Sequence, residues 1–313
     1  MTNSVATRPE RIAIVGAGFI GRSWALLFAQ HGHRVTIHDP DTDALSAVSE
    51  AIRASLDLLD RVGLLDETPH AVLDRITAEP DLGAALLDAD YVQENGPERL
   101  DVKRAIFAGM DRLAPPSAVL ASSSSSLTRS RIGADLPGRS RCLLVPPANP
   151  PHLLRAVEIV PANFTDTEVT GRAVSILRDV GQVPVVIGEI DGFVMNRLQA
   201  ALVREALALV ERGIADARTV DAIVQHSLGP RWAFMGPFET MDLNAPGGFS
   251  DYAQRYGVPF AQWSGEDSWS ETAVSAVDAA RRADCPAEAL DDRRIWRDET
   301  LAALIAHLKR TTG

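Results

Sequence analysis

The sequence predicts an α/β fold with a doubly wound, mostly parallel sheet, followed by an all-α C-terminal domain. Short apolar runs, typical of buried strands, alternate with helical patterns from residue 11 to residue 187. Beyond Gly188 this alternation stops, and only helical patterns remain. We therefore expect one domain over residues 1–188 and a second, helical domain over residues 189–313.

Composition places the chain among ordinary globular proteins. It has 313 residues, 46% of them hydrophobic and 23% charged, which is enough for two domains and a large core. Its net charge of −11 argues against nucleic-acid and membrane-surface partners. No stretch reaches about 18 uninterrupted apolar residues, and no leader is visible, so we expect a cytoplasmic protein. Cys142 and Cys285 match no metal or redox spacing, and no metal is expected.

A glycine pattern near the start of the chain indicates a nucleotide site. The apolar run Ile12–Val15 ends on Gly16, and Gly18 and Gly21 complete a G-x-G-x-x-G that leads into an apolar segment. That order predicts strand, tight turn and helix. Gly16 would allow the turn, Gly18 would let the backbone approach a pyrophosphate, and Gly21 would let helix and strand pack closely.

Two features around this pattern favour NAD. Phe19 and Ile20 open the expected helix, where free N–H groups and the positive end of the helix dipole bind an anion. Asp39 ends the next strand candidate, Arg34–His38, and lies 23 residues after Gly16. A carboxylate there accepts hydrogen bonds from a ribose 2′-hydroxyl and repels a 2′-phosphate. The alternative is a structural glycine turn followed by an ordinary surface aspartate.

The remaining elements follow in order. Expected strands are Ile76–Ala78, Tyr91–Glu94, Ala118–Ala121, Cys142–Val145, Ala156–Val160 and Val183–Ile187. Expected helices are Asp43–Leu59, a short one near Pro69–Arg75, Glu98–Leu113 with Pro97 at its start, Asp166–Val180, and Val194–Glu211, with further helices beyond.

Polar groups after these strands are candidate site residues. Ser122–Ser126 follows a strand that should end at the carboxyl edge of the sheet, so its hydroxyls either bind a substrate oxygen or cap the next helix. Pro146–Pro151 is a stiff loop. Glu158, inside an apolar strand, needs a partner and either forms a salt bridge or orients a catalytic neighbour. Asn196 opens the long helix, where a local packing role is the alternative.

The chain resembles the 3-hydroxyacyl-CoA dehydrogenases, and within them the lambda-crystallin (L-gulonate 3-dehydrogenase) branch, over about residues 11–255. The matching motifs are Gly-Arg-Ser-Trp-Ala at 21–25, Lys-Arg-Ala-Ile-Phe at 103–107, Gly-Phe-Val-Met-Asn-Arg-Leu-Gln at 192–199 and Gly-Pro-Arg-Trp-Ala-Phe-Met-Gly-Pro-Phe-Glu-Thr-Met at 229–241. The resemblance implies a Rossmann domain, a helical domain that forms a homodimer, and hydride transfer between NAD and a 3-hydroxy substrate.

The resemblance also implies site residues, with one departure. The family's substrate-binding serine corresponds to Ser125, and its general base, a histidine 21 residues further on, corresponds to Pro146. The base's glutamate partner falls on Glu158, 12 residues later, and the family's asparagine falls on Asn196. Because three of the four positions are in register, the base itself is replaced. Glu158, without its imidazole, could bind a cation, orient a water or have a raised pKa.

Other residues carry smaller expectations from the same resemblance. Glu94 and Glu98 match family acids on the nicotinamide side. Arg231 matches an arginine that faces the substrate pocket, and a guanidinium there would bind a carboxylate bidentately, with an interface or core salt bridge as the alternative. His152, or else His226, is a possible surrogate base.

Three functions remain open at this point. The first is an NAD-dependent oxidoreductase acting on a small 3-hydroxy or keto acid, with an atypical acid/base because the usual histidine is Pro146. The second is a non-redox enzyme on the same fold, catalysing condensation, cyclisation or elimination. The third is a catalytically silent NAD-binding or structural homologue.

Overall fold

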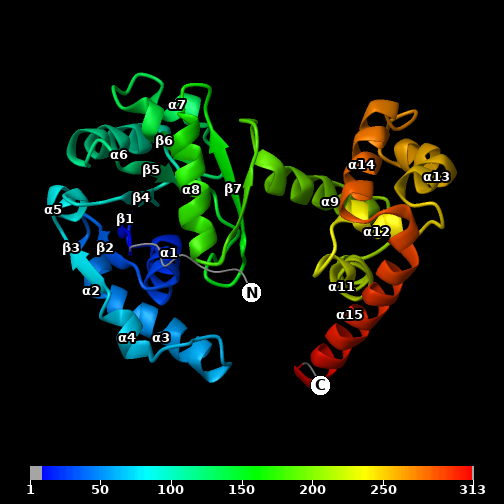
Figure 1. The fold of residues 1–313 in the computed structure, drawn as a ribbon, viewed down its shortest axis with the longest axis horizontal. Helices are drawn as coiled ribbons and strands as arrows, with labels where there is room; N and C mark the ends of the chain where they lie inside the picture. The colour runs from blue at the N-terminus through cyan, green and yellow to red at the C-terminus, as the bar shows by residue number, and fades with distance from the viewer. Residues whose placement is uncertain (1–8, 312–313) are drawn as a thin grey trace. The chain divides into compact units, whose positions relative to one another are not determined.

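The computed structural model describes residues 9–311, and the chain separates into two compact units, Met1–Ala201 and Leu202–Gly313. The division falls inside one helix, α9 (Phe193–Glu211), so the first turns of α9 belong to the first unit. Figure 1 shows the α/β unit in blue to green and the helical unit in yellow to red.

The first unit is built on a single sheet of eight strands in the order β3-β2-β1-β4-β5-β6-β7-β8. The strands are β1 (Arg11–Val15), β2 (Arg34–His38), β3 (Ile76–Glu79), β4 (Tyr91–Glu94), β5 (Val119–Ser122), β6 (Cys142–Leu144), β7 (Ala156–Pro161) and β8 (Val183–Val186). All neighbours pair in parallel except β6 and β7, which are antiparallel. This confirms the predicted doubly wound, mostly parallel sheet.

Helices cover both faces of the sheet. One face packs against α1 (Phe19–Gln30), α3 (Val48–Arg61), α4 (Pro69–Leu73) and α8 (Thr167–Asp179). The other packs against α5 (Leu82–Leu86), α6 (Leu100–Leu113) and α7 (Arg129–Gly133). Because successive strand side chains point to opposite faces, Ile12 and Ile14 enter the first core while Ala13 and Val15 enter the second.

Two expected helices have different bounds. The segment expected as one helix from Asp43 to Leu59 is broken at Ala47 into α2 (Thr42–Ser46) and α3. Leu45 and Val48, on either side of the break, are both buried, so the bend keeps both short apolar faces on the core. The helix expected from Glu98 begins at Leu100.

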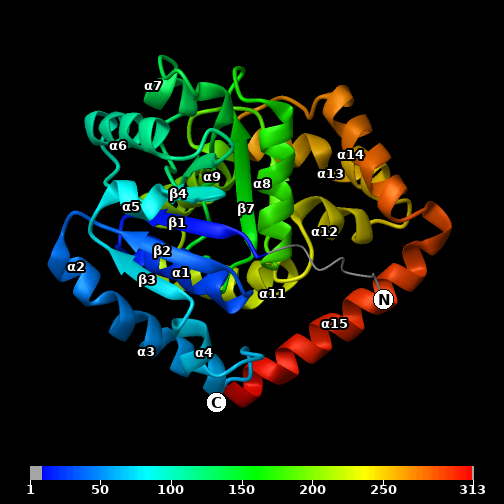
Figure 2. The ribbon, with the colours of Figure 1, turned by 60° about the vertical axis from the view of Figure 1, so that its left-hand side comes forward.

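The second unit is helical, as predicted. It contains α10 (Ala217–Ile223), a π-helical turn (Val224–Leu228), α11 (Gly229–Trp232), α12 (Pro237–Leu243), α13 (Phe249–Trp263), α14 (Glu271–Asp284), a 3-10 turn (Ala287–Ala289) and α15 (Leu290–Thr311). Its buried centre includes Asp242, which accepts hydrogen bonds from the Phe249 backbone N–H and the Arg282 guanidinium. In Figure 2 the last helix, α15, is the long red element. None of the described helices is both long and apolar enough to cross a membrane.

Candidate functional site

The glycine pattern forms a tight turn between β1 and α1. Gly16 has a φ of +106°, a conformation that L side chains rarely adopt, and a Cβ added there would lie 2.8 Å from the Asn95 carbonyl oxygen. A Cβ added to Gly21 would lie only 1.9 Å from the Gly16 carbonyl oxygen. Gly16 and Gly21 therefore let strand, turn and helix touch, and any larger residue would push them apart.

Gly18 occupies a different environment. It is the N-cap of α1, and a Cβ added to it would meet nothing within 4 Å. No side chain caps this end of α1, and its first turn, beginning with Phe19 and Ile20, contains no acidic residue. The first N–H groups of the helix are thus open to an outside acceptor. This cradle fits a pyrophosphate.

Asp39 links the end of β2 to the glycine turn. One carboxylate oxygen, Oδ2, accepts the Ala17 N–H at 2.8 Å, and the other, Oδ1, accepts the Asp41 N–H at 3.0 Å. A carboxylate oxygen can accept more than one hydrogen bond, so both retain capacity for a ribose hydroxyl. The placement fits a nucleotide with a free 2′-hydroxyl.

A buried ion pair fixes the carboxyl ends of β4 and β5. Lys103 and Glu94 are both fully buried, and the Lys103 ammonium donates to both carboxylate oxygens of Glu94 at 3.0 Å. Glu94 also accepts the Ser122 hydroxyl at 2.5 Å and the Gly96 N–H at 2.6 Å. Glu94 therefore anchors this edge of the sheet, and a contact with NAD from its carboxylate stays a prediction. Sequence reasoning gave Lys103 no role, although a lysine within an amphipathic helix beside a buried acid was a usable signal.

Glu98 organises the serine run. Its Oε1 accepts the hydroxyls of Ser124 and Ser126 at 2.6 and 2.8 Å and the Ser126 N–H at 3.0 Å. Burial raises the pKa of Glu98, but these hydrogen bonds and the Lys103 charge outweigh it and hold the pKa below its usual value. Glu98 is thus an anion that folds the loop around itself.

Ser125 differs from the other four serines of the run. The hydroxyls of Ser122, Ser123, Ser124 and Ser126 all bond to side chains of the first unit. Ser125 is exposed, and among residues 9–311 no partner is found for its hydroxyl. The run is therefore largely structural, with one hydroxyl left for an outside group.

Glu158 connects β7 to the start of α9. It is buried, and its Oε1 accepts the N–H groups of Val194 and Met195 at 2.8 and 2.9 Å. Neither of the two partners expected from sequence, a salt-bridging cation or a catalytic neighbour, is bonded to it within the described chain. Asn196 follows in the same turn, and its Nδ2 donates to the Ser125 carbonyl at 3.1 Å. The structure thus brings Ser125 and Asn196 together and places Glu158 behind them.

Pro146 lies just past β6, is buried, and accepts the Glu158 N–H on its carbonyl at 3.3 Å. The position corresponding to the family base is therefore next to the Glu158 backbone. Proline has no titratable atom and no N–H to offer a substrate.

His152 lies on the tip of a hairpin that starts at this point. Pro147 forms an antiparallel bridge with Val157, so residues 149–155 turn beyond the paired segment. Burial lowers the pKa of His152, and its Nδ1 is buried with no hydrogen-bond partner in the described part of the chain. The histidine is thus neutral near pH 7 and lies several residues along the hairpin from Pro146.

Arg231 and His226 belong to the second unit. The Arg231 Nε donates to the Ser227 carbonyl at 3.2 Å, and no ion pair from its guanidinium to an acidic residue is present over residues 9–311. The core salt bridge considered as its alternative role is therefore not formed within this unit. His226 is an exposed residue of the π-helical turn.

We predict different effects for alanine substitutions at Gly18 and at Gly21. We expect Gly21→Ala to destabilise the fold by about 3 kcal/mol, because its Cβ collides with the backbone of the turn. We expect Gly18→Ala to unfold at nearly the wild-type temperature but to bind NAD at least about tenfold more weakly, because its Cβ occupies the open cradle. Thermal unfolding and calorimetric NAD titration check both. Equal stability loss in the two variants would contradict this division of roles.

Comparison with known proteins agrees with this geometry. The family profile described as "3-hydroxyacyl-CoA dehydrogenase, NAD binding domain" matches residues 11–190, and "3-hydroxyacyl-CoA dehydrogenase, C-terminal domain" matches residues 192–283. The chain is 40% identical to lambda-crystallin of Oryctolagus cuniculus over 96% of each chain. It is 36% identical to L-carnitine dehydrogenase of Streptomyces coelicolor over 87% of this chain and 85% of that one.

A solved structure shows the same architecture over nearly the whole chain. It is 5-formyl-3-hydroxy-2-methylpyridine 4-carboxylic acid 5-dehydrogenase, an NAD+-dependent dismutase, with a TM-score of 0.73 and 25% identity. The alignment covers 92% of this chain and 98% of that one. The same two-part architecture thus occurs in a protein named as an NAD+-dependent dehydrogenase. The chain belongs to the 3-hydroxyacyl-CoA dehydrogenase family and is an NAD-binding, dehydrogenase-like oxidoreductase.

Proposed function

We propose that this oxidoreductase acts on a small 3-hydroxy or keto acid and does so without an imidazole base at position 146. The observation that carries the proposal is the free Ser125 hydroxyl, which is exposed beside Asn196 while its four serine neighbours are engaged. A hydroxyl so placed suits a substrate oxygen.

Residues of the first unit would bind the cofactor and the substrate oxygen. The cradle at Gly18 and Asp39 would hold NAD, which supplies the hydride acceptor or donor when bound. Ser125 would bind the substrate oxygen, and Asn196 would hold the Ser125 backbone in place through its amide. Glu158 would keep Asn196 in position by capping α9.

The proton is the difficult part of this reaction. Oxidation of an alcohol must remove the hydroxyl proton, and a positioned side chain typically contributes about 10²–10⁴-fold to such a step. Pro146 cannot take it, and Glu158 is held at the start of α9 by two N–H groups on its Oε1, so that its Oε2 would only orient a water. The proton would therefore pass from the Ser125 side of the substrate to solvent water, and oxidation would be slow.

Arg231 would set the substrate class. Its guanidinium has no acidic partner within the described chain, so it can bind a carboxylate bidentately. A free acid fits that role better than a thioester, whose acyl group offers a single neutral carbonyl oxygen in place of two oxygens that share a negative charge. The pyridine carboxylic acid dehydrogenase described above, whose structure is similar to this chain, is named for a substrate that carries a free carboxylic acid, which agrees with this choice.

A non-redox reaction on the same site is the second candidate. The absence of a titratable group at Pro146, with Glu158 committed to α9, favours it. Substrate consumption at constant NADH absorbance would identify that alternative.

We further propose that the chain forms a homodimer through its helical unit. Val203, Leu207 and Val210 lie on one side of α9, and Leu207 is 65% exposed. Apolar side chains at this spacing form a stripe that a second copy could bury.

Restoring the base tests the redox proposal most directly. In Pro146→His we expect 3-hydroxy acid oxidation, followed as NADH formation, to rise by about 10²-fold. The Glu158 Oε2 atom has no hydrogen bond within the described chain and can orient the new imidazole. Pro147→His is the matched control and should not gain activity. An unchanged rate in Pro146→His would contradict the base-deleted dehydrogenase and favour non-redox or silent alternatives.

Replacing the proposed carboxylate ligand tests the substrate class. We expect Arg231→Gln to lower kcat/KM for 3-hydroxybutyrate by at least about tenfold, because a charged hydrogen bond is lost, while kcat/KM for 3-hydroxybutyryl-CoA stays constant. Arg218→Gln, an exposed arginine of α10, should change neither value. Equal losses for acid and thioester would remove the carboxylate role from Arg231.

The dimer proposal predicts a change in mass. Leu207→Arg should shift the protein to a monomer in sedimentation, because an unpaired charge would be buried in the interface. Arg204→Gln, on the same helix, should sediment as wild type. A wild-type mass for Leu207→Arg would place the interface elsewhere.

A further inference from the structure

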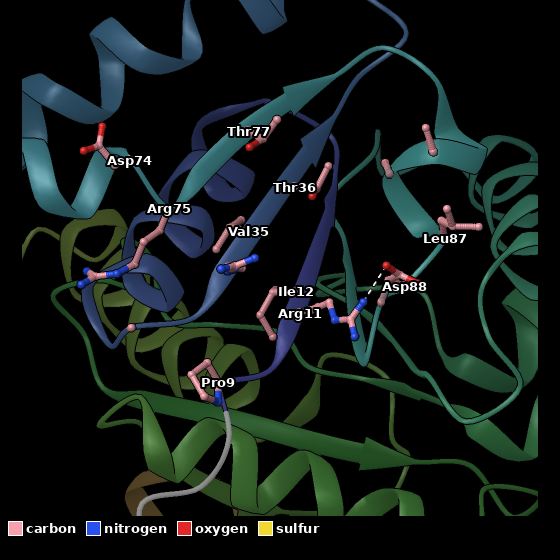
Figure 3. Close-up of a pocket in the computed structure, with 15 residues that line it drawn as sticks. Pro9, Arg11, Ile12, Val35, Thr36, Asp74, Arg75, Thr77, Leu87 and Asp88 are labelled. Atoms are coloured by element: carbon pink, nitrogen blue, oxygen red, sulfur yellow. Dashed lines mark ion pairs between the residues drawn. The ribbon is translucent and has the colours of Figure 1, made fainter.

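A pocket lies at the amino ends of β1, β2 and β3, on the edge of the sheet opposite the glycine turn. It has a volume of about 610 Å³, within the range of small-molecule sites. Gly16 and Asp39, which would hold the nucleotide, follow the carboxyl ends of β1 and β2, while Arg11 and Arg34 begin the same two strands. None of the cradle residues lines the pocket, which is therefore separate from the NAD cradle. Figure 3 shows the residues that line the pocket.

Part of its floor is an uncovered piece of sheet. Thr36 on β2 and Thr77 on β3 are register partners, and both line the pocket. Thr36 is half-buried and Thr77 is exposed. Neither hydroxyl makes a hydrogen bond with any residue from 9 to 311. The crossover helix α5, which has five residues, lines the other side of the pocket with Ala84 and Ala85. Two neighbouring hydroxyls are thus available to a ligand.

The backbones of three arginines lie side by side along this edge. Arg11 and Arg34 are register partners at the starts of their strands, and the Val35 N–H donates to the Arg75 carbonyl at 2.9 Å, which places Arg75 beside them. All three line the pocket. Parallel strands lie roughly 4.8 Å apart, so the starts of β1 and β2 hold Arg11 and Arg34 close to each other.

Two of these arginines already have partners. Arg11 pairs with Asp88 at 2.6 Å across the wall of the pocket, as the dashed line in Figure 3 shows. Arg75 pairs with Glu67 at 2.5 Å, donates to the Ala29 carbonyl, and points away from the threonines in Figure 3. Arg34 has no acidic partner and no hydrogen bond from its side chain within the described residues.

The remaining acid of the pocket, Asp74, forms no ion pair with Arg34 within the described residues. Asp74 lies 3.3 Å from the His70 ring and is exposed. The pocket thus contains one guanidinium fork without an anion, next to two free hydroxyl groups on the adjoining strands. This is the donor set for a small ligand with a carboxylate or phosphate group.

We propose that this pocket binds a small oxyanion-bearing metabolite, with its carboxylate or phosphate on Arg34 and its remaining oxygens on Thr36 and Thr77. Recognition there depends on the guanidinium fork rather than on charge alone. The site does not require the proposed dehydrogenase reaction, because it lies at the other edge of the sheet.

Calorimetric titration of the NAD-saturated protein tests this site. Saturating NAD fills the cradle at α1, which could otherwise bind the probes. Inorganic phosphate and citrate serve as the two probes, at one fixed ionic strength because exposed charges are screened by salt. Saturable binding of phosphate alone would identify a phosphoryl ligand. Saturable binding of citrate alone would identify a carboxylate ligand.

Variants assign the binding to the pocket. We expect Arg34→Gln to weaken it at least about tenfold, since a charged hydrogen bond is lost, and Arg34→Lys to recover part of the affinity. Thr36→Val combined with Thr77→Val should weaken binding with the charge intact. Arg53→Gln, an exposed arginine of α3, should bind as wild type. NAD affinity should be constant in all, which confirms folding.

Two results would overturn the proposal. One is the absence of saturable binding by both probes. The other is binding whose affinity is the same in Arg34→Gln as in the wild-type protein. Neither result bears on the proposed dehydrogenase function, which is measured by NADH formation.

Discussion

The buried pair of Lys103 and Glu94 holds the carboxyl edge of the sheet, and the candidate site depends on it. Both side chains are removed from water, so each requires the other, and loss of one partner of such a pair costs about 3–5 kcal/mol. The pair joins three segments: the end of β4, the first turn of α6 and the start of the serine run at Ser122. Glu98 then holds the next part of the serine run by accepting the hydroxyls of Ser124 and Ser126. The position of the Ser125 hydroxyl is a consequence of these two carboxylates.

The sequence predicted features that arise from local stereochemistry. The turn at Gly16 and the close packing at Gly21 follow from spacing within a few residues, and strand and helix periods are also local properties. The broken helix at Ala47 was missed because the apolar spacing continues through it, and only the packing of Leu45 and Val48 shows the bend.

Hydrogen-bond partners that are distant in the sequence could not be predicted, for a different reason. Glu158 bonds to the backbone N–H groups of Val194 and Met195, and backbone groups are the same at every residue, so no pattern identifies them. Likewise, five consecutive serines are chemically equivalent in the sequence. The family resemblance points to Ser125, and the folded loop gives the physical reason, because the hydroxyls of its four neighbours are engaged by Glu94, Asn95 and Glu98.

These contacts change what the resemblance can say about catalysis. Glu158 and Asn196 are in register with family catalytic residues, yet each also stabilises the local structure. Glu158 caps α9, and Asn196 donates a hydrogen bond to the Ser125 backbone. A protein that had lost hydride transfer would still need both for its fold. Their presence therefore does not by itself distinguish a slow dehydrogenase from a non-redox enzyme. The distinction depends on two groups that have no such structural role, the Ser125 hydroxyl and the side chain at Pro146. The Ser125 hydroxyl has no partner within the described chain, and the Pro146 side chain has no polar atom.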